Sequence, residues 1–134
     1  MRNKKKNILY FTNEKKIDMD LTNLNFEKAE CYRTDFSRSK FENLNMRAAK
    51  FKFCSFFGAN LKNVNLIGAN LKGSNLTNAD LTGANLKSAN LEGANFKGAI
   101  ITNATFTNTS IAKAKNLIIE VAKTEQNEDN TTEE

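Results

Sequence analysis

Residues 83–98 read GANLKSANLEGANFKG, and in this stretch a small residue, an asparagine and a large apolar residue return every five positions. We call the large apolar residue the centre of each repeat. A step of five rotates an α-helix by about 140°, which would scatter the centres around the helix. In a straight strand the same step would place successive centres on opposite faces. The pattern keeps every centre inside only when the chain turns a corner every five residues.

The repeat extends well beyond this stretch. It makes 19 consecutive copies without an insertion, with centres from Leu21 to Ile111. A long tandem array of short units indicates a solenoid, in which each unit packs on its neighbours. The absence of proline from the chain is consistent with stacked coils that need their backbone N–H donors.

The residue two positions after each centre indicates how the corner is made. All six glycines stand there, and from 58 to 108 this position is Gly or Asn in every repeat except at Ser88. Gly and Asn tolerate a positive φ, which a type II turn needs. Before residue 58 five repeats have another residue type at this position, so we expect those corners to use another turn type. They include Lys28, Arg33, Arg38, Ala48 and Phe53.

The charged residues predict how many corners make one coil. Residues one coil apart stack about 4.8 Å from each other, so opposite charges are favoured at that spacing. Within residues 19–113, a spacing of 20 gives five opposite pairs, such as Glu30 with Lys50, and one like pair. Spacings of 15 and 25 give mostly like pairs. The chain is therefore expected to place four repeats in each coil.

With these features the sequence resembles the pentapeptide-repeat family, whose motif is A(D/N)Lxx. The resemblance runs from about Met19 to Lys113. It implies an all-β fold, a right-handed quadrilateral β-helix with four repeats per coil and, here, just under five coils. It is less informative about function, because some members protect DNA gyrase or topoisomerase with an acidic, DNA-like rod, while others are effectors or scaffolds.

The segments outside the repeats are expected to close its ends. We predict an N-terminal cap over residues 1–18, the β-helix over 19–113, a short C-terminal capping helix over 114–123 and a disordered acidic tail over 124–134. The cap would use apolar side chains such as Ile8 and Phe11. An open coil exposes its last layer, so such caps are needed.

The composition argues against an enzyme and against a cofactor. The chain has no histidine, which is the commonest general base and metal ligand. Its two cysteines, Cys31 and Cys54, fall on inward positions and are expected to be inert core thiols. The apolar run at residues 8–11 is too short for a signal-peptide core or a membrane span, so we expect a cytoplasmic protein that does not bind a membrane.

One outward patch is the best candidate for a functional site. Exposed aromatic side chains beside arginine are the usual chemistry of a protein interface, and they also suit stacking on nucleic acid. Arg33 is expected to stack on Phe53, one coil away. The alternative is that Phe53 and Phe57 lie beneath residues 1–18 as part of the cap. The candidate residues are Tyr32, Arg33, Arg38, Lys52, Phe53, Phe57 and Lys72.

Three functions remain open at this point. The favoured one is a non-catalytic scaffold that binds a protein partner, with a homodimer through a terminal coil as a further possibility. The second is a topoisomerase-protecting DNA mimic. Such a mimic should be acidic, because DNA carries about one negative charge per 1.7 Å, whereas residues 19–113 hold 12 basic and 7 acidic residues. The third is a nucleic-acid binder that uses the basic N-terminal half, where residues 1–62 carry 14 basic and 7 acidic side chains.

Overall fold

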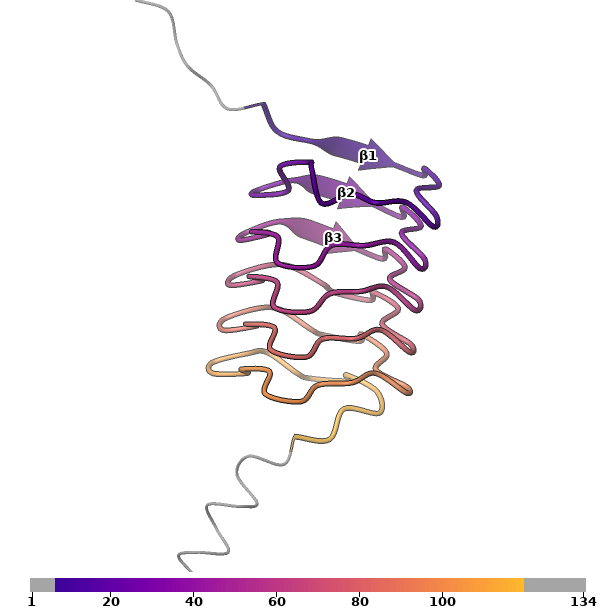
Figure 1. Ribbon diagram of the computed structural model, residues 1–134. Coiled ribbons are helices and arrows are strands. Elements are labelled where there is room, and N and C mark those ends of the chain that lie inside the picture. Colours follow the sequence, from indigo (N-terminus) through magenta and orange to yellow (C-terminus); the bar gives the residue numbers. More distant parts are fainter. Residues whose placement is uncertain (1–6, 120–134) are drawn as a thin grey trace, which may run out of the picture.

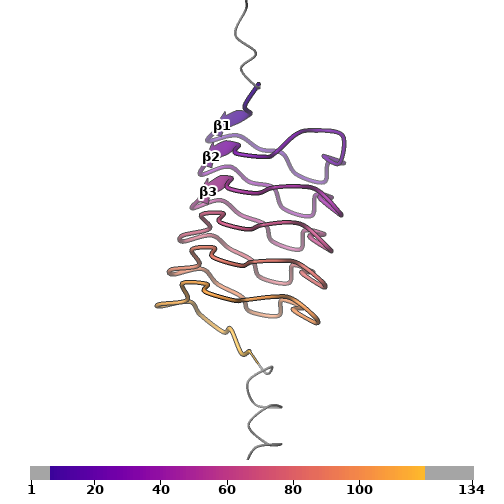
Figure 2. The same ribbon diagram turned by 90° about the vertical axis from the view of Figure 1, so that its left-hand side faces the viewer.

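The computed structural model describes residues 7–119, which wind into a column of stacked coils (Figure 1). Backbone bridges join residues that are 20 positions apart, such as Asn45 with Asn65 and Asn65 with Asn85. One coil therefore takes four five-residue repeats, as the spacing of opposite charges predicts. Figure 2 shows the same column from a direction at a right angle, with successive coils lying one above the other.

Three short strands form one wall of the first coils. They are β1 (Tyr10–Thr12), β2 (Glu30–Tyr32) and β3 (Lys50–Lys52), and they form a parallel sheet in the order β1-β2-β3. In each strand the middle residue points into the column, and its two neighbours face outward. Side chains alternate across a strand, so this wall presents an outer surface made of the first and third residues of each strand.

The core is a stack of repeat centres. In the first coils these are phenylalanines whose ring centroids lie 5.0 to 6.3 Å apart, many of them edge to face. From Leu61 to Leu91 every centre is a fully buried leucine. The asparagine before a centre holds the local turn, since at Asn45, Asn65 and Asn85 its Oδ1 accepts a hydrogen bond from the N–H two residues later.

The corners are more uniform than the sequence predicts. Lys28, Arg33, Arg38, Ala48 and Phe53 were expected to use another turn type, but their φ angles of 51° to 62° match the left-handed conformation of the glycine corners. The reason is pairing between coils. For example, the backbone N–H of Arg33 donates to the carbonyl of Lys52 at 3.2 Å, and the equivalent bond recurs at Gly73 with Glu92. These bonds dictate the corner conformation whatever side chain stands there.

Inter-coil pairing begins before Met19, within the segment expected to be only a cap. β1 pairs with β2 in register, and Lys15 bridges Asp35. Lys16 takes the position of a repeat centre, where its Nζ lies 4.8 Å from the centroid of the Phe11 ring. Residues 10–18 therefore form part of the first coil, and Phe11 packs against the core below it.

The C-terminal helix predicted over 114–123 is wrong where the structure describes it. Residues 114–119 are not helical, and residues 7–119 contain no helix at all. Instead the N–H of Lys115 donates to the carbonyl of Ala94 at 2.7 Å, so the chain continues to pair with the coil before it. Asn116, with φ 60°, interrupts any helical run. Residues 120–123 and the predicted tail lie outside the described residues.

Candidate functional site

The structure places four of the seven predicted patch residues together on the strand wall. Tyr32 and Lys52 are the last residues of β2 and β3, and they are partners in the sheet register. Arg33 and Phe53 follow them directly at the corner. Because every coil has the same length, these side chains stand in two adjacent columns along the rod.

Tyr32, Arg33 and Phe53 form an aromatic–arginine cluster. The rings of Tyr32 and Phe53 meet edge to face, with centroids 6.0 Å apart and an interplanar angle of 84°. The guanidinium carbon of Arg33 lies 5.2 Å from the Tyr32 centroid and 5.4 Å from the Phe53 centroid. Tyr32 is 39% exposed and Phe53 is 41% exposed, so the cluster is ordered by its own contacts and still faces solvent.

The Phe53 ring lies on a glycine of the next coil. A Cβ added to Gly73 would come 2.5 Å from two carbons of the ring. A glycine is thus required at 73 both for its φ of +66° and for the space that the ring takes. The ring is fixed by Gly73 on one side and by Arg33 and Tyr32 on the other.

The remaining three predicted residues do not join this cluster. The guanidinium of Arg38 donates to the carboxylate of Asp18 at 2.8 and 3.1 Å, and these bonds hold the pKa of Asp18 below its ordinary value. Lys72 pairs with Glu92 at 3.9 Å. Phe57 belongs to the following repeat and is half-buried.

The first coil leaves Phe53 open to solvent. Residues 10–18 lie in their own coil, paired with the coil that contains β2. Phe53 is 41% exposed although residues 10–18 are in place, so these residues do not cover its ring. Residues 1–6, which belong to the cap of the alternative interpretation, lie outside the described residues.

Sequence reasoning missed the other half of this surface. A groove of about 220 Å³ runs over the strand wall and is lined by Tyr10, Thr12, Glu30, Cys31, Tyr32, Lys50 and Lys52. Tyr10 is 63% exposed and stands one coil before Glu30. The signal was present, because counting back 20 residues from Glu30 leads to Tyr10. We did not extend the repeat back to Tyr10 because Lys16 stands at a centre position and interrupts the run of apolar centres.

The charges on this wall are only partly neutralised. Lys50 pairs with Glu30 at 3.7 Å. Elsewhere on the rod, Lys62 and Lys72 pair with Asp80 and Glu92. Within residues 7–119, neither Arg33 nor Lys52 has a carboxylate within 4 Å. Two cations without a carboxylate partner among residues 7–119 therefore stand beside two exposed rings.

The thiols lie beneath this wall and inside the core. Cys31 and Cys54 are free and buried. Burial raises the pKa of Cys31 to about 12 and that of Cys54 to about 11. The described residues hold no group of three or more His, Cys, Asp or Glu side chains that would bind a metal ion.

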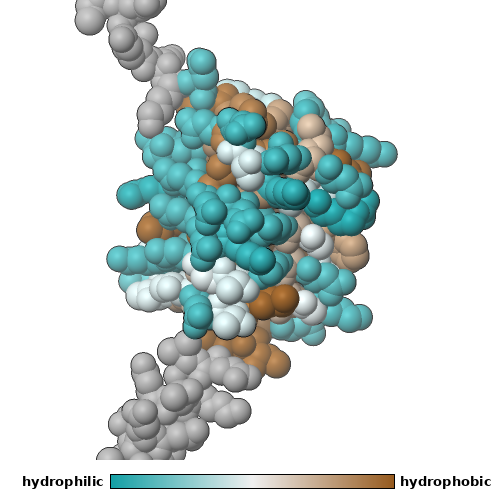
Figure 3. Space-filling model, viewed as in Figure 1, coloured by the Kyte–Doolittle hydropathy of each residue, from teal (hydrophilic) through white to brown (hydrophobic). Residues whose placement is uncertain are grey.

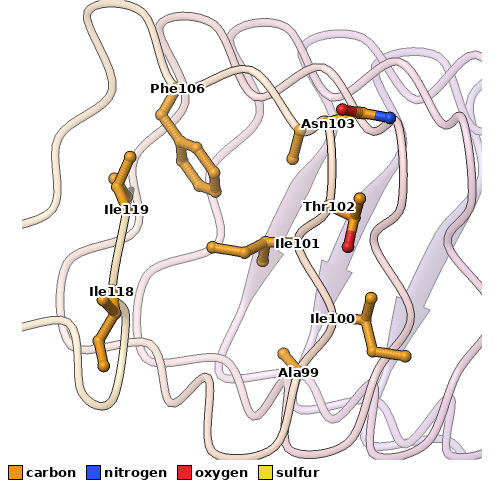
Figure 4. Close-up of a pocket in the computed structure, with 9 residues that line it drawn as sticks. Ala99, Ile100, Ile101, Thr102, Asn103, Phe106, Ile118 and Ile119 are labelled. Atoms are coloured by element: carbon orange, nitrogen blue, oxygen red, sulfur yellow. The ribbon is translucent and has the colours of Figure 1, made fainter. Parts of the chain in front are cut away.

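A second hollow lies at the other end of the rod. It measures about 360 Å³, and Phe106 and Ile101 lie on one side of it while Ile118 and Ile119 lie on the other (Figure 4). In the space-filling view the rod surface is largely hydrophilic, while brown residues gather at its C-terminal end (Figure 3). Residues 7–119 contain no helix that is long and apolar enough to cross a membrane.

Known proteins share both the repeat and the fold. The family model of pentapeptide repeats matches in 8 copies over residues 18–52, 54–93 and 79–115. The solved structure of the pentapeptide repeat protein Rfr23 from the cyanobacterium Cyanothece 51142 is 24% identical over 81% of this chain and 84% of its own, with a TM-score of 0.65. No curated protein sequence gives a significant match.

Two further solved structures are similar. HetL, a pentapeptide repeat protein involved in heterocyst differentiation regulation from Nostoc sp. strain PCC 7120, is 24% identical over 78% of this chain and 48% of its own, with a TM-score of 0.52. Full-length QnrB1, a plasmid-mediated fluoroquinolone resistance protein, is 19% identical over 82% of this chain and 68% of its own, with a TM-score of 0.62. At such identities the likeness shows the fold alone. Since the family model spans most of the described coils, this chain belongs to the pentapeptide-repeat family.

Proposed function

We propose that this protein is a non-catalytic scaffold that binds a protein partner through the strand wall of its first coils. The binding surface consists of Tyr10, Tyr32, Arg33, Lys52 and Phe53. The observation that supports it is the exposed cluster in which the guanidinium of Arg33 contacts the rings of both Tyr32 and Phe53. Tyr and Arg are enriched among the residues that dominate binding energy at interfaces.

Local stability does not account for this cluster. A non-glycine residue in the left-handed conformation costs roughly 1–2 kcal/mol, and both Arg33 and Phe53 have that conformation. An exposed cation–π contact returns only about 0.5–1 kcal/mol. Glycine or asparagine at these two corners, as in later coils, would suit the backbone better. The side chains are therefore better explained by what they bind.

Two other functions receive less support. QnrB1 is a fluoroquinolone resistance protein, and a protective DNA mimic would need an acidic rod, whereas residues 19–113 here hold 12 basic and 7 acidic residues. A nucleic-acid binder would need a continuous basic stripe. On this rod Lys50, Lys62 and Lys72 each pair with a carboxylate, which interrupts such a stripe.

The test is a quantitative pull-down followed by mass spectrometry. The tagged protein is compared with the double variant Tyr32→Ser, Phe53→Ser and with a matched variant, Lys87→Gln, which alters an exposed side chain on another wall. We expect the double variant to lose the specific partner and to keep its thermal melt, while Lys87→Gln retains the partner. If the double variant melts far lower and its N-terminal residues are cleaved rapidly, the cluster is part of a cap, and the proposed site is withdrawn. A separate Phe57→Ser variant tests whether the half-buried ring contributes.

We further propose that residues 19–113 form just under five coils of a right-handed rod, which acts in the cytoplasm and pairs with a second copy through its C-terminal coil. The support for pairing is the exposure of Ile100, Ile111 and Ile118 at that end. Light scattering after size-exclusion chromatography should give a dimer for the native chain and a monomer for Ile118→Asp. A native chain that stays monomeric at high concentration would remove this proposal.

A further inference from the structure

We infer that the partner binds this wall through an acidic segment, in which Asp or Glu carboxylates stand beside an apolar side chain. Arg33 and Lys52 hold the carboxylates, while Tyr32 and Phe53 contact the apolar side chain. This inference rests on the proposed function and adds to it the chemistry of the partner. The proposed binding surface is basic, whereas the family members that protect gyrase or topoisomerase use an acidic, DNA-like rod.

The first argument is the orientation of Arg33. Its guanidinium carbon lies 5.2 and 5.4 Å from two ring centroids, so aromatic rings contact the guanidinium and limit its motion. Stacking engages the π face of a guanidinium and leaves the N–H donors at its edge for other partners. A carboxylate accepts two parallel hydrogen bonds from that edge. The side chain is thus already ordered before an anion binds, which reduces the entropy lost on binding.

The second argument is charge balance. The wall carries three cations, Arg33, Lys50 and Lys52, against one carboxylate, Glu30, and the Glu30 carboxylate is paired with Lys50. No carboxylate of residues 7–119 lies within 4 Å of the other two cations. Arg38 and Lys72 do have such a partner, whereas Lys87 and Lys97 on other parts of the rod have none among residues 7–119. What distinguishes Arg33 and Lys52 is that they stand beside the exposed rings of Tyr32 and Phe53. The anion that complements Arg33 and Lys52 is therefore expected from another molecule.

The third argument is the shape of the surface. The groove of about 220 Å³ runs beside Tyr32 and Lys52 and is bordered by the exposed ring of Tyr10. Cys31, the middle residue of β2, lines its floor. An apolar side chain flanked by carboxylates would fit this arrangement, with its carbon atoms against the rings and its charges at the rim.

Protein carboxylates fit better than the phosphates of a nucleic acid. A nucleic-acid strand presents a phosphate at every nucleotide and needs a row of cations. Here the two free cations are followed along the rod by Lys72, which is neutralised by Glu92. A short acidic peptide needs only the two cations that are available.

The experiment measures binding of defined peptides to the full chain by fluorescence anisotropy. The probe is a labelled peptide in which glutamates alternate with leucines, and its counterpart has glutamine in place of each glutamate. We expect saturable binding of the glutamate peptide, at least about tenfold weaker binding of the glutamine peptide, and weaker binding when NaCl rises from about 50 mM to about 500 mM. A labelled single-stranded oligothymidylate is titrated in parallel.

Three variants locate the binding. Arg33→Gln should weaken the glutamate peptide about tenfold. Arg33→Lys keeps the charge but loses the planar fork and the ring stacking, so it should weaken binding nearly as much. Lys87→Gln removes the same charge from another wall and should leave binding unchanged.

The outcomes separate this inference from the proposed function. Equal binding of the two peptides, or loss of binding in Lys87→Gln, overturns the inference. So does an oligothymidylate that binds more tightly than the glutamate peptide, which would indicate a nucleic-acid surface. If the pull-down partner depends on Phe53 and Tyr32 but not on Arg33 or on salt, the proposed function stands and the acidic segment is wrong.

Discussion

The residues at the corners differ most from one coil to the next. Every corner has the same left-handed backbone, but the side chain there is a glycine in some coils and an arginine or phenylalanine in others. At two corners a large side chain lies on the glycine of the next coil. Phe53 lies on Gly73 and Arg38 lies on Gly58, whose added Cβ would come 3.3 Å from the Arg38 Cγ. At these two places a large corner residue is paired with a glycine one coil later.

This pairing predicts different costs for two chemically identical substitutions. Gly68 and Gly73 have φ angles of +69° and +66°, but a Cβ at 68 meets nothing within 4 Å while a Cβ at 73 overlaps the Phe53 ring. We expect Gly68→Ala to cost about 1–2 kcal/mol and Gly73→Ala to cost clearly more. The free energy of unfolding from urea titrations measures both. In a Phe53→Ala background the two substitutions should become equal, and equal costs in the native background would contradict the contact.

A second prediction concerns the centres. Leu81 is fully buried between Leu61 and Ile101 of the neighbouring coils. Leu81→Ala is expected to lower the free energy of unfolding by about 2–5 kcal/mol, because it removes buried methyl groups and leaves a cavity. Ile100→Ala, at an exposed position of the same region, should cost about 1 kcal/mol or less. A Leu81→Lys variant that melts cooperatively at the native temperature would show that the centres do not point inward.

The thiols give a third prediction. Since burial raises the pKa of Cys31 to about 12 and that of Cys54 to about 11, almost no thiolate is present near pH 8. Ellman's reagent should react with neither thiol in the folded protein and with both in concentrated urea. Rapid reaction of one thiol without denaturant would mean that the strand wall opens readily.

At the scale of elements, β1 has two roles. Its outward residues Tyr10 and Thr12 extend the candidate binding surface, while Phe11 between them closes the top of the core. The ring of Phe11 lies 6.3 and 6.2 Å from those of Phe26 and Phe36. A strand of three residues thus joins the stability of the rod to its proposed function.

Two variants of β1 test its structural role and its binding role separately. Phe11→Ser should destabilise the protein by about 1–3 kcal/mol, since it removes a half-buried ring from the aromatic core. Tyr10→Ser should change stability by no more than about 0.5 kcal/mol but weaken partner binding. Thermal melts and the pull-down read the two effects independently. A Tyr10→Ser variant that is strongly destabilised would place this ring in the cap instead.

At the scale of the whole molecule, the rod has unlike ends. Cations and exposed rings lie on the first coils, and isoleucines surround the hollow at the last coil. The net charge of the chain is +5. A partner that recognises the first coils would leave the other end free for a second copy.

The overall charge predicts the result of a gyrase assay. Because the repeat region is basic and not acidic, we expect no relief of fluoroquinolone inhibition in a supercoiling assay at micromolar concentrations of the protein. QnrB1 serves as the positive control. Clear protection by this protein would instead favour the topoisomerase-protecting alternative.

The sequence by itself determined everything that repeats locally. The period of five, the inward centres and the coil of 20 residues follow from residue types at regular spacing, because each repeat obeys the same rule of burial and turn formation. The stack of Arg33 on Phe53 followed from that coil length alone. The pairs Glu30–Lys50 and Lys72–Glu92, expected from spacing, are present in the structure.

Only the tertiary structure decided where the coils begin and end and which outward side chains meet. Lys16 breaks the apolar pattern, yet its coil forms because β1 bonds to β2. Lys115 pairs with Asn95 of the preceding coil, and residues 114–119 form no helix. Arg38, which was predicted in the patch, instead pairs with Asp18. Tyr10 and Lys50, which were not predicted there, line the groove beside it. In each case the outcome depends on hydrogen bonds and ion pairs between residues about 20 positions apart, and these contacts exist only once the coils are stacked.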